Sequence, residues 1–232
     1  MAYNNYGNRF QQTTPAVLNL IIINVLVYLA QMVTGNGTET NIVNDLFALH
    51  HYKSAYFKPH QLVTYMFMHG GFFHLFFNMF SLWMFGTVVE KSWGPKKFLV
   101  FYFICGIVSG ITQLGSYAHD FWQYDHNILS PEMQQEYAAG LRALVTVGAS
   151  GAIMGVLVAF GYLFPNTELF IMPIPFPIKA KWAITGMIAL DVFGGVVKVQ
   201  GDNIAHFAHI GGALTGLVLV LYWNKRNRKT FY

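Results

Sequence analysis

Charged residues are scarce in this sequence. Asp, Glu, Lys and Arg together make up 10% of the 232 residues, whereas 54% of the residues are hydrophobic. A soluble domain carries about 25% charged residues, so the composition excludes an ordinary water-soluble domain. The hydrophobic residues gather into runs that can cross a bilayer as helices, for which about 20 residues are needed. We therefore expect an integral membrane protein that spans the bilayer several times.

Cysteine is nearly absent, and the surplus of basic residues is small. The single cysteine, Cys105, lies within a hydrophobic run, which excludes a disulfide framework. The chain has 14 Lys and Arg residues against 10 Asp and Glu residues, and its basic residues lie between the hydrophobic runs. This placement gives no basis for a nucleic-acid partner and makes the basic residues signals of membrane topology.

Six hydrophobic runs are candidates for transmembrane helices. They cover residues 16–33, 62–89, 98–114, 141–163, 182–199 and 204–223. Turn residues at Gly201, Asp202 and Asn203 separate the last two runs, so the fifth helix should end shortly before Val199. The expected fold is all-α, a polytopic bundle of six transmembrane helices over residues 16–223. An N-terminal segment, residues 1–15, precedes the bundle, and a basic tail, residues 224–232, follows it.

The distribution of Lys and Arg predicts the orientation of these helices. Ten of the fourteen basic residues fall on one side of the membrane if the N-terminus is cytoplasmic. Because cytoplasmic loops carry an excess of Lys and Arg, we expect both termini to be cytoplasmic and the loop 116–140 to be external. The expected location is the cytoplasmic (inner) membrane of a bacterium.

Polar side chains recur at similar depth in three of the expected helices. They are His69, His74 and Asn78 in the second run, Ser150 in the fourth run, and His206 and His209 in the sixth run. Such side chains cost free energy in hydrocarbon unless they face the bundle interior or water, so they are candidates for function. A water-filled cavity open to the outer face would satisfy all of them.

Ser150 stands among small residues, in the stretch Gly148-Ala149-Ser150-Gly151. Small neighbours leave its hydroxyl sterically open, although Gly151 and Gly155 also fit a packing face of the Gly-x-x-x-Gly type. The sixth run holds a second small-residue step beside His209. Two such helices can approach until their backbones nearly touch, which would bring His209 within hydrogen-bonding distance of Ser150. Without that approach, His209 is a core histidine with a satisfied ring.

His74 and Asn78 are four residues apart, so they share one face of the second expected helix. Both side chains can donate hydrogen bonds. Donors of this kind stabilise the negatively charged oxygen that develops during acyl transfer. A polar clamp between helices, worth about 1 kcal/mol in membranes, is the alternative interpretation.

Taken together, these motifs resemble the rhomboid family of intramembrane serine proteases. Gly148-Ala149-Ser150-Gly151 is similar to the family's Gly-x-Ser-Gly, and residues 74–78 are similar to its His-x-x-x-Asn. Residues 206–212, which contain His206 and His209, resemble the motif of its sixth helix. The three motifs occur in the expected order, and the resemblance extends from the first helix through the sixth.

The resemblance implies an intramembrane serine endopeptidase with a Ser–His dyad. Ser150 is the implied nucleophile and His209 the implied general base, while His74, Asn78 and the Ser150 backbone amide are implied to hold the oxyanion. No cofactor and no metal are implied. The implied partners are transmembrane segments of membrane-protein substrates within the lipid bilayer, and no pattern in the sequence specifies an oligomeric state.

Two features depart from the family pattern. The Trp-Arg pair that is common before the second helix is absent from residues 59–64. Met154 stands four residues after Ser150, where members often carry an aromatic residue that stacks on the catalytic histidine. A methionine can also pack against an imidazole ring.

Other functions have less support in the sequence. No His-Glu-x-x-His string occurs, which excludes that type of metalloprotease, and Asp191 is the only acidic residue well inside a hydrophobic run, which excludes an aspartyl pair. We expect Asp191 to be a structural or cavity-lining group and the dyad to work without an acidic third member. Two alternatives stay open. One is an inactive rhomboid-like factor that binds membrane proteins, and the other is a metal or proton pathway lined by His69, His74, His206 and His209.

Overall fold

The computed structural model describes residues 14–35, 42–120, 122, 130–171, 173–197 and 205–226. Most of the expected N-terminal segment and the last six residues of the expected tail lie outside the described residues. The described elements, in chain order, are α1 (Pro15–Thr34), α2 (Ile42–Phe47), β1 (Leu49–His50), α3 (Gln61–Thr64), η1 (Tyr65–Phe67), α4 (Phe72–Ser81), η2 (Leu82–Gly86), α5 (Thr87–Trp93), α6 (Pro95–Asp120), α8 (Pro131–Ala143), β2 (Val145–Thr146), α9 (Ser150–Leu163), β3 (Glu168–Leu169), β4 (Ile178–Lys179), α10 (Ala180–Val197) and α11 (His206–Arg226).

The fold is helical, and within the residues that the structure describes five helices are long and apolar enough to cross a membrane. They cover Pro15–Thr34, Phe72–Trp93, Pro95–His119, Ala180–Val197 and His206–Lys225. One further apolar helix, α9, has only 14 residues. The all-α, polytopic architecture is therefore confirmed, whereas the prediction of six helices of spanning length is not. The fifth helix ends at Val197, as the turn residues after it predict.

The prediction of a second helix over residues 62–89 is wrong at its N-terminal end. The short helices α3 and η1 occupy residues 61–67, and the chain is extended at Met68 before α4 begins at Phe72. Two consecutive glycines, Gly70 and Gly71, separate these parts, and glycine disfavours a helix by about 1 kcal/mol per residue. From Phe72 to Trp93 the chain continues as α4, η2 and α5, with a π-helical turn at η2. His69 therefore precedes the spanning helix, and His74 lies in its first turn.

The prediction of a fourth helix over residues 141–163 is also wrong at its N-terminal end. Helix α8 ends at Ala143, strand β2 follows, and α9 begins only at Ser150. Strand β2 pairs antiparallel with β1, with Leu49 opposite Thr146. Pairing with a distant strand holds this segment extended although its residues are as apolar as those of a helix. Ser150 is consequently the first residue of its helix.

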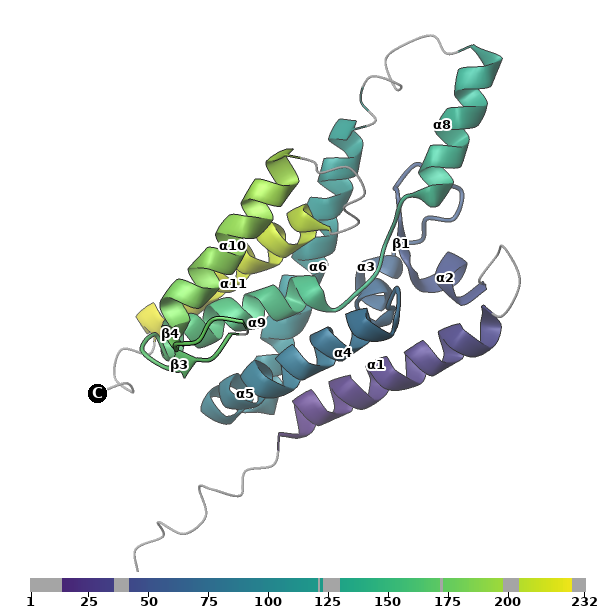
Figure 1. Cartoon of the computed structure of the whole chain (residues 1–232). Helices are drawn as coiled ribbons and strands as arrows, with labels where there is room; N and C mark the ends of the chain where they lie inside the picture. The colour runs from purple at the N-terminus through teal and green to yellow at the C-terminus, as the bar shows by residue number, and fades with distance from the viewer. Residues whose placement is uncertain are drawn as a thin grey trace, which may run out of the picture.

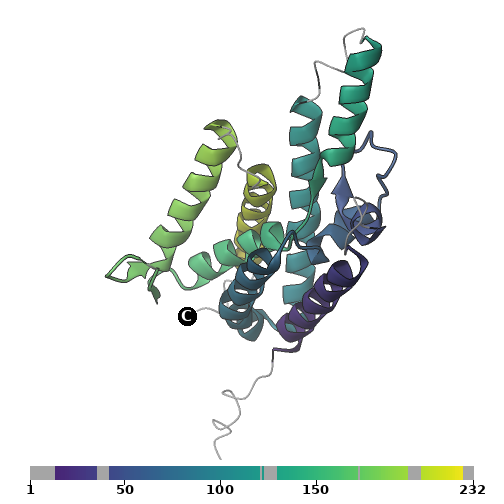
Figure 2. The ribbon, with the colours of Figure 1, turned by 45° about the vertical axis from the view of Figure 1, so that its right-hand side comes forward.

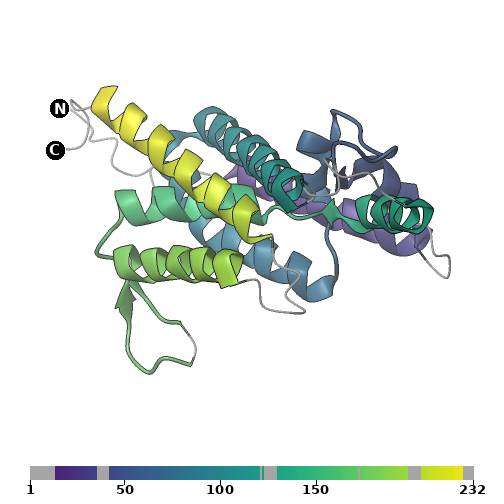
Figure 3. The same cartoon turned by 90° about the horizontal axis from the view of Figure 1, so that it is seen from above.

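Helix α9 lies at the centre of the bundle. It contacts α4, η2, α5, α6, α10 and α11, and all residues from Gly151 to Gly161 are buried. Figure 1 shows α9 crossing the middle of the molecule, and Figure 3 shows it beside α10 and α11. Helix α8 extends away from the other helices beside the end of α6, as Figure 2 shows. The β3–β4 hairpin, which follows α9 and precedes α10 in the chain, projects beyond α10 at the opposite end of the molecule (Figure 3).

A buried carboxylate fixes the beginning of α1. Glu90 of α5 is 2% exposed and accepts hydrogen bonds from the backbone N–H groups of Ala16 and Val17, at 3.0 and 2.8 Å. These N–H groups have no carbonyl partner within their own helix, and the helix dipole favours a negative charge there. Glu90 therefore ties the first helix to the second spanning segment.

Candidate active site

Ser150 lies where extended chain becomes helix. Gly148 has a φ of 122°, in the region that favours glycine, and turns the chain from β2 toward α9. The hydrogen bond from Ile153 N–H to Ala149 O closes the first turn of the helix. The backbone N–H of Ser150 lies before this first helical hydrogen bond, so no carbonyl of the helix accepts from it. The positive end of the helix dipole is thus directed at the space beside the Ser150 hydroxyl, which favours a negatively charged oxygen there.

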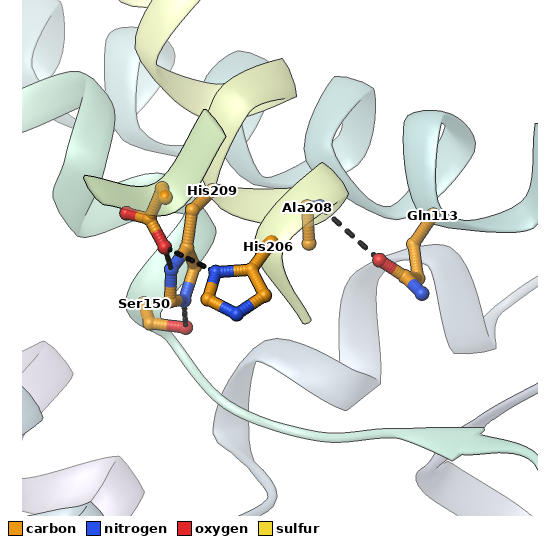
Figure 4. A network of polar contacts seen from close by, with 6 residues as sticks. Gln113, Ser150, His206, Ala208 and His209 are labelled. Carbon is orange, nitrogen blue, oxygen red and sulfur yellow. Dashed lines mark hydrogen bonds and ion pairs between the residues drawn. The ribbon is translucent and has the colours of Figure 1, made fainter. Parts of the chain in front are cut away.

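His209 lies in the first turn of α11 and faces this hydroxyl. Its Nε2 is 2.7 Å from Ser150 Oγ, and the close view in Figure 4 shows the two side chains in contact. The contact depends on close packing of two helices, because a side chain at Gly212 of α11 would overlap the carbonyl oxygen of Gly151 in α9. The predicted approach of two small-residue helix faces is confirmed, and it brings His209 to Ser150.

Asp191 of α10 contacts the same histidine from the other side. Its Oδ1 lies 3.0 Å from Nδ1 of His209 and 2.8 Å from Nδ1 of His206. The three side chains are between 13% and 17% exposed. No sequence motif supplies a partner for Asp191, whereas the structure gives it two. The packing of α10 against α11 brings together residues 15 and 18 positions apart.

The His74 ring presents a donor to the neighbourhood of Ser150. Gly70 N–H donates to Nδ1 of this ring, at 3.3 Å, and the tautomer that accepts this bond carries its proton on Nε2. A Cβ at Gly148 would lie 2.8 Å from Nε2 of His74 and 3.7 Å from Oγ of Ser150. The protonated side of the ring therefore faces the turn that leads to the serine.

Asn78 is buried one turn further along α4. Its Nδ2 donates to the carbonyl oxygen of His74, at 2.8 Å, within the same helix. This bond does not connect two helices, so it gives no support to the clamp interpretation. It uses one of the two amide protons and leaves the second for another acceptor.

Two supports of this region are not evident from the sequence motifs. Gln31 of α1 accepts a hydrogen bond from His69 N–H at 3.0 Å and donates to His69 O at 3.2 Å, which fixes the chain before α4. Gly148 N–H donates to Tyr65 O at 2.9 Å, which fixes the chain before α9. In both segments that carry site residues, backbone groups are thus hydrogen-bonded to another element, through the Gln31 side chain in one and the Tyr65 carbonyl in the other.

Gln113 of α6 supports the third segment. Its Oε1 accepts a hydrogen bond from the backbone N–H of Ala208 in the first turn of α11, at 3.2 Å (Figure 4). Gln113 is 6% exposed, and its position inside the hydrophobic run 98–114 is the sequence signal that could have indicated it. This bond fixes the helix end that carries His209.

The four histidines considered for a metal or proton pathway form two pairs. The rings of His69 and His74 meet edge to face with their centroids 5.1 Å apart, whereas His206 and His209 share Asp191. Both ring nitrogens of His209 contact protein groups. Within the described ranges, no three or more His, Cys, Asp or Glu side chains are grouped so as to hold a metal ion. Coordination by His209 would require it to give up one of its two bonds.

The fold and this geometry define a class of protein. It is a polytopic helical membrane protein with a serine at the start of a short central helix and a histidine of the last helix against its hydroxyl. Comparison with known proteins agrees with this class. A family model described as Rhomboid domain matches residues 56–226. The chain belongs to the rhomboid family, and it is an integral membrane protein.

Several relatives are similar over much of the chain. Rhomboid protease AarA of Providencia stuartii is 28% identical over 209 residues, which are 87% of this chain and 70% of that protein. Rhomboid protein 1, mitochondrial, of Saccharomyces cerevisiae is 29% identical over 163 residues, 70% of this chain and 41% of that protein. Presenilin-associated rhomboid-like protein, mitochondrial, of Homo sapiens is 29% identical over 220 residues, 94% of this chain and 51% of that protein. The chain thus spans about half the length of the two mitochondrial relatives.

Proposed function

We propose that this protein is an intramembrane serine endopeptidase that cleaves transmembrane segments of membrane-protein substrates. The observation that carries the proposal is the 2.7 Å separation between Ser150 Oγ and His209 Nε2. Membership in the rhomboid family supports it, since relatives of this chain include proteins named as rhomboid proteases. The presence of both side chains argues against an inactive factor that only binds membrane proteins.

In the proposed reaction, His209 Nε2 takes the proton from the Ser150 hydroxyl while Oγ attacks the scissile carbonyl carbon. His209 then gives this proton to the leaving amine nitrogen as the C–N bond breaks, and an acyl-enzyme remains on Oγ. A water molecule gives a proton to His209 and attacks the acyl carbon. The same proton returns to Ser150 Oγ as the new carboxyl product leaves.

The negative oxygen of the tetrahedral intermediate needs donors that are already in place. We assign this role to the Ser150 backbone N–H, the His74 ring and the Asn78 side chain. The start of α9 at Ser150 supports the first, and the Nε2–H tautomer of His74, turned toward Gly148, supports the second. Asn78 donates to His74 O and has one further amide proton for this oxygen.

Hydrolysis within a membrane also needs water at the serine. A helix of 14 residues is about 21 Å long, shorter than a hydrocarbon core of about 30 Å, so α9 does not cross the core by itself. We propose that its first residue, Ser150, lies below the membrane surface. The chain just before Ser150 is not helical, and such backbone is tolerated at membrane depth only inside protein or beside a water-filled cavity. We propose that a cavity open to the outer face brings water to Ser150. We also propose the bacterial cytoplasmic membrane as the location, with both termini cytoplasmic.

A serine-directed fluorophosphonate with a fluorescent reporter tests the proposal on detergent-solubilised protein. The unmodified protein should be labelled, Ser150→Ala should not, and His209→Ala should be labelled far more slowly. Ser92→Ala, which removes an exposed hydroxyl of α5, is the matched control and should be labelled normally. In proteoliposomes, Ser150→Ala should also lose cleavage of a model transmembrane substrate. Labelling of Ser150→Ala at the normal rate, or binding of the substrate with no cleavage by the unmodified protein, would contradict the proposal.

A further inference from the structure

Asp191 holds a position that the Ser–His pair alone does not explain. A carboxylate inside a membrane bundle is costly unless it is paired, and this one faces two imidazole rings through a single oxygen atom. An ionised carboxylate only accepts hydrogen bonds, so each ring must direct an Nδ1–H at it. The rings of His206 and His209 therefore share one tautomer.

This tautomer matters for the serine. With its proton on Nδ1, the His209 ring leaves the Nε2 lone pair free, and Nε2 is the atom 2.7 Å from Ser150 Oγ. With the opposite tautomer, Nε2 would donate to the hydroxyl and could not take its proton. Asp191 also lies 3.0 Å from the ring that becomes positively charged when Nε2 is protonated. A fixed negative charge at that distance stabilises the imidazolium.

The backbone of α10 is shaped to hold the second histidine as well. Gly194 lies one turn after Asp191, and a Cβ there would be 2.5 Å from both Cε1 and Nε2 of the His206 ring. The ring thus occupies the space that a side chain at Gly194 would fill. At Gly186, in the same helix, a Cβ would meet nothing within 4 Å. The close contact with the His206 ring is therefore made at the turn of α10 that follows the carboxylate and not at Gly186.

We propose that Asp191 and His206 are positioning residues for His209, so that the serine protease unit is Ser150–His209–Asp191 with His206 fixing the carboxylate. This inference rests on the proposed function. His206 donates to Asp191 Oδ1, the carboxylate holds the Nδ1–H of His209, and His209 Nε2 accepts the serine proton. A clamp between α10 and α11 uses the same bonds but leaves the rate of the chemical step unchanged, so kinetics separate the two roles.

The decisive variant is Asp191→Asn, which keeps the shape of the side chain and removes its charge. We expect kcat to fall roughly 100- to 10,000-fold with little change in KM, and fluorophosphonate labelling of Ser150 to slow in parallel. Formate added to Asp191→Ala should restore part of the labelling rate, because it supplies a carboxylate at the vacated position. A merely structural aspartate would give no such rescue.

Two glycine variants test the part played by His206. Gly194→Ala should displace the ring and lower kcat about 10-fold, the loss of one charge-assisted hydrogen bond, whereas Gly186→Ala should behave as the unmodified protein. Equal activity in these two variants would overturn the role of His206. The glycine pair and the formate experiment also decide the matter if Asp191→Asn does not fold.

Failure of this inference is distinguishable from failure of the proposed function. If Ser150→Ala abolishes cleavage while Asp191→Asn retains at least half of kcat, the protein is a protease whose dyad works without the carboxylate, and the inference is overturned. If Ser150→Ala keeps full cleavage, the proposed function itself fails. A lower melting temperature of Asp191→Asn with unchanged kcat and labelling rate would reduce Asp191 to a clamp.

Discussion

The His74 ring lies against the backbone of Gly148, two residues before Ser150. A Cβ at position 148 would be 2.8 Å from both Cε1 and Nε2 of the ring. Gly148 is also one of two glycines with positive φ within the described residues. The start of α4 and the turn into α9 thus meet at a position that excludes a side chain on two grounds, conformation and space.

Gly148→Ala should therefore lower both stability and activity. The positive φ costs about 1 kcal/mol for a residue with a Cβ, and the methyl group must displace the His74 ring. Gly94→Ala is the matched control, because Gly94 has a φ of 81° but a Cβ there would meet nothing within 4 Å. We expect both variants to lose thermal stability, Gly148→Ala more than Gly94→Ala because only its methyl group meets the ring, and a fall in kcat of roughly 10-fold or more only in Gly148→Ala. Comparable kcat values for the two would show that the His74 ring does not need its present place.

His74→Ala and Asn78→Ala separate oxyanion stabilisation from a polar clamp. If the two side chains hold the oxyanion, kcat should fall roughly 10- to 1,000-fold while the melting temperature in detergent barely changes. A clamp would instead cost about 1 kcal/mol of stability and leave kcat unchanged. We expect the larger loss for His74, since its donor faces the turn before Ser150, whereas Asn78 donates to the carbonyl of its own helix. Unchanged turnover in both variants would leave the Ser150 amide as the remaining donor.

Gly212→Ala should disrupt the packing of α9 against α11. The added methyl group would overlap the Gly151 carbonyl oxygen, and backbone on both sides leaves little room to adjust. Overpacking of this kind costs about 3 kcal/mol, and separation of the helices would draw His209 away from Ser150. Gly115→Ala in α6 is the control, since a Cβ there would meet nothing within 4 Å and alanine is the better helix former. Thermal unfolding in detergent and the fluorophosphonate labelling rate measure both effects, and a fully active, equally stable Gly212→Ala would refute the close contact.

The predicted topology can be tested with single cysteines at Gln12 and Asn227, one near each end of the chain. An impermeant thiol reagent should fail to label either position in intact bacterial cells and should label both after lysis, because the excess of Lys and Arg favours cytoplasmic termini. The native Cys105 is fully buried, so it adds little background. A cysteine at Ser130, in the loop expected to be external, is the positive control. Labelling of Gln12→Cys or Asn227→Cys before lysis would show that the orientation is wrong.

The sequence by itself determined the membrane setting, the approximate position of each apolar helix and the residues worth testing. Long hydrophobic runs cross a bilayer for a reason that depends on composition alone, the free energy of transfer into hydrocarbon. The small residues around Ser150 and His209 likewise predict close helix packing, because only a missing side chain allows two backbones to meet. Polar groups within such runs are candidates for function, so His74 and Asn78 can be selected from the sequence alone.

Only the tertiary structure decided where the helices begin and which groups meet. Hydropathy does not distinguish an apolar helix from an apolar extended segment, so the helix start at Ser150 depends on the pairing of Thr146 with Leu49, about a hundred residues away in the chain. The same is true of Asp191, which gains its partners when α10 packs against α11. No sequence spacing predicts that a carboxylate on one helix contacts a histidine on another helix. That contact depends on how the two helices pack.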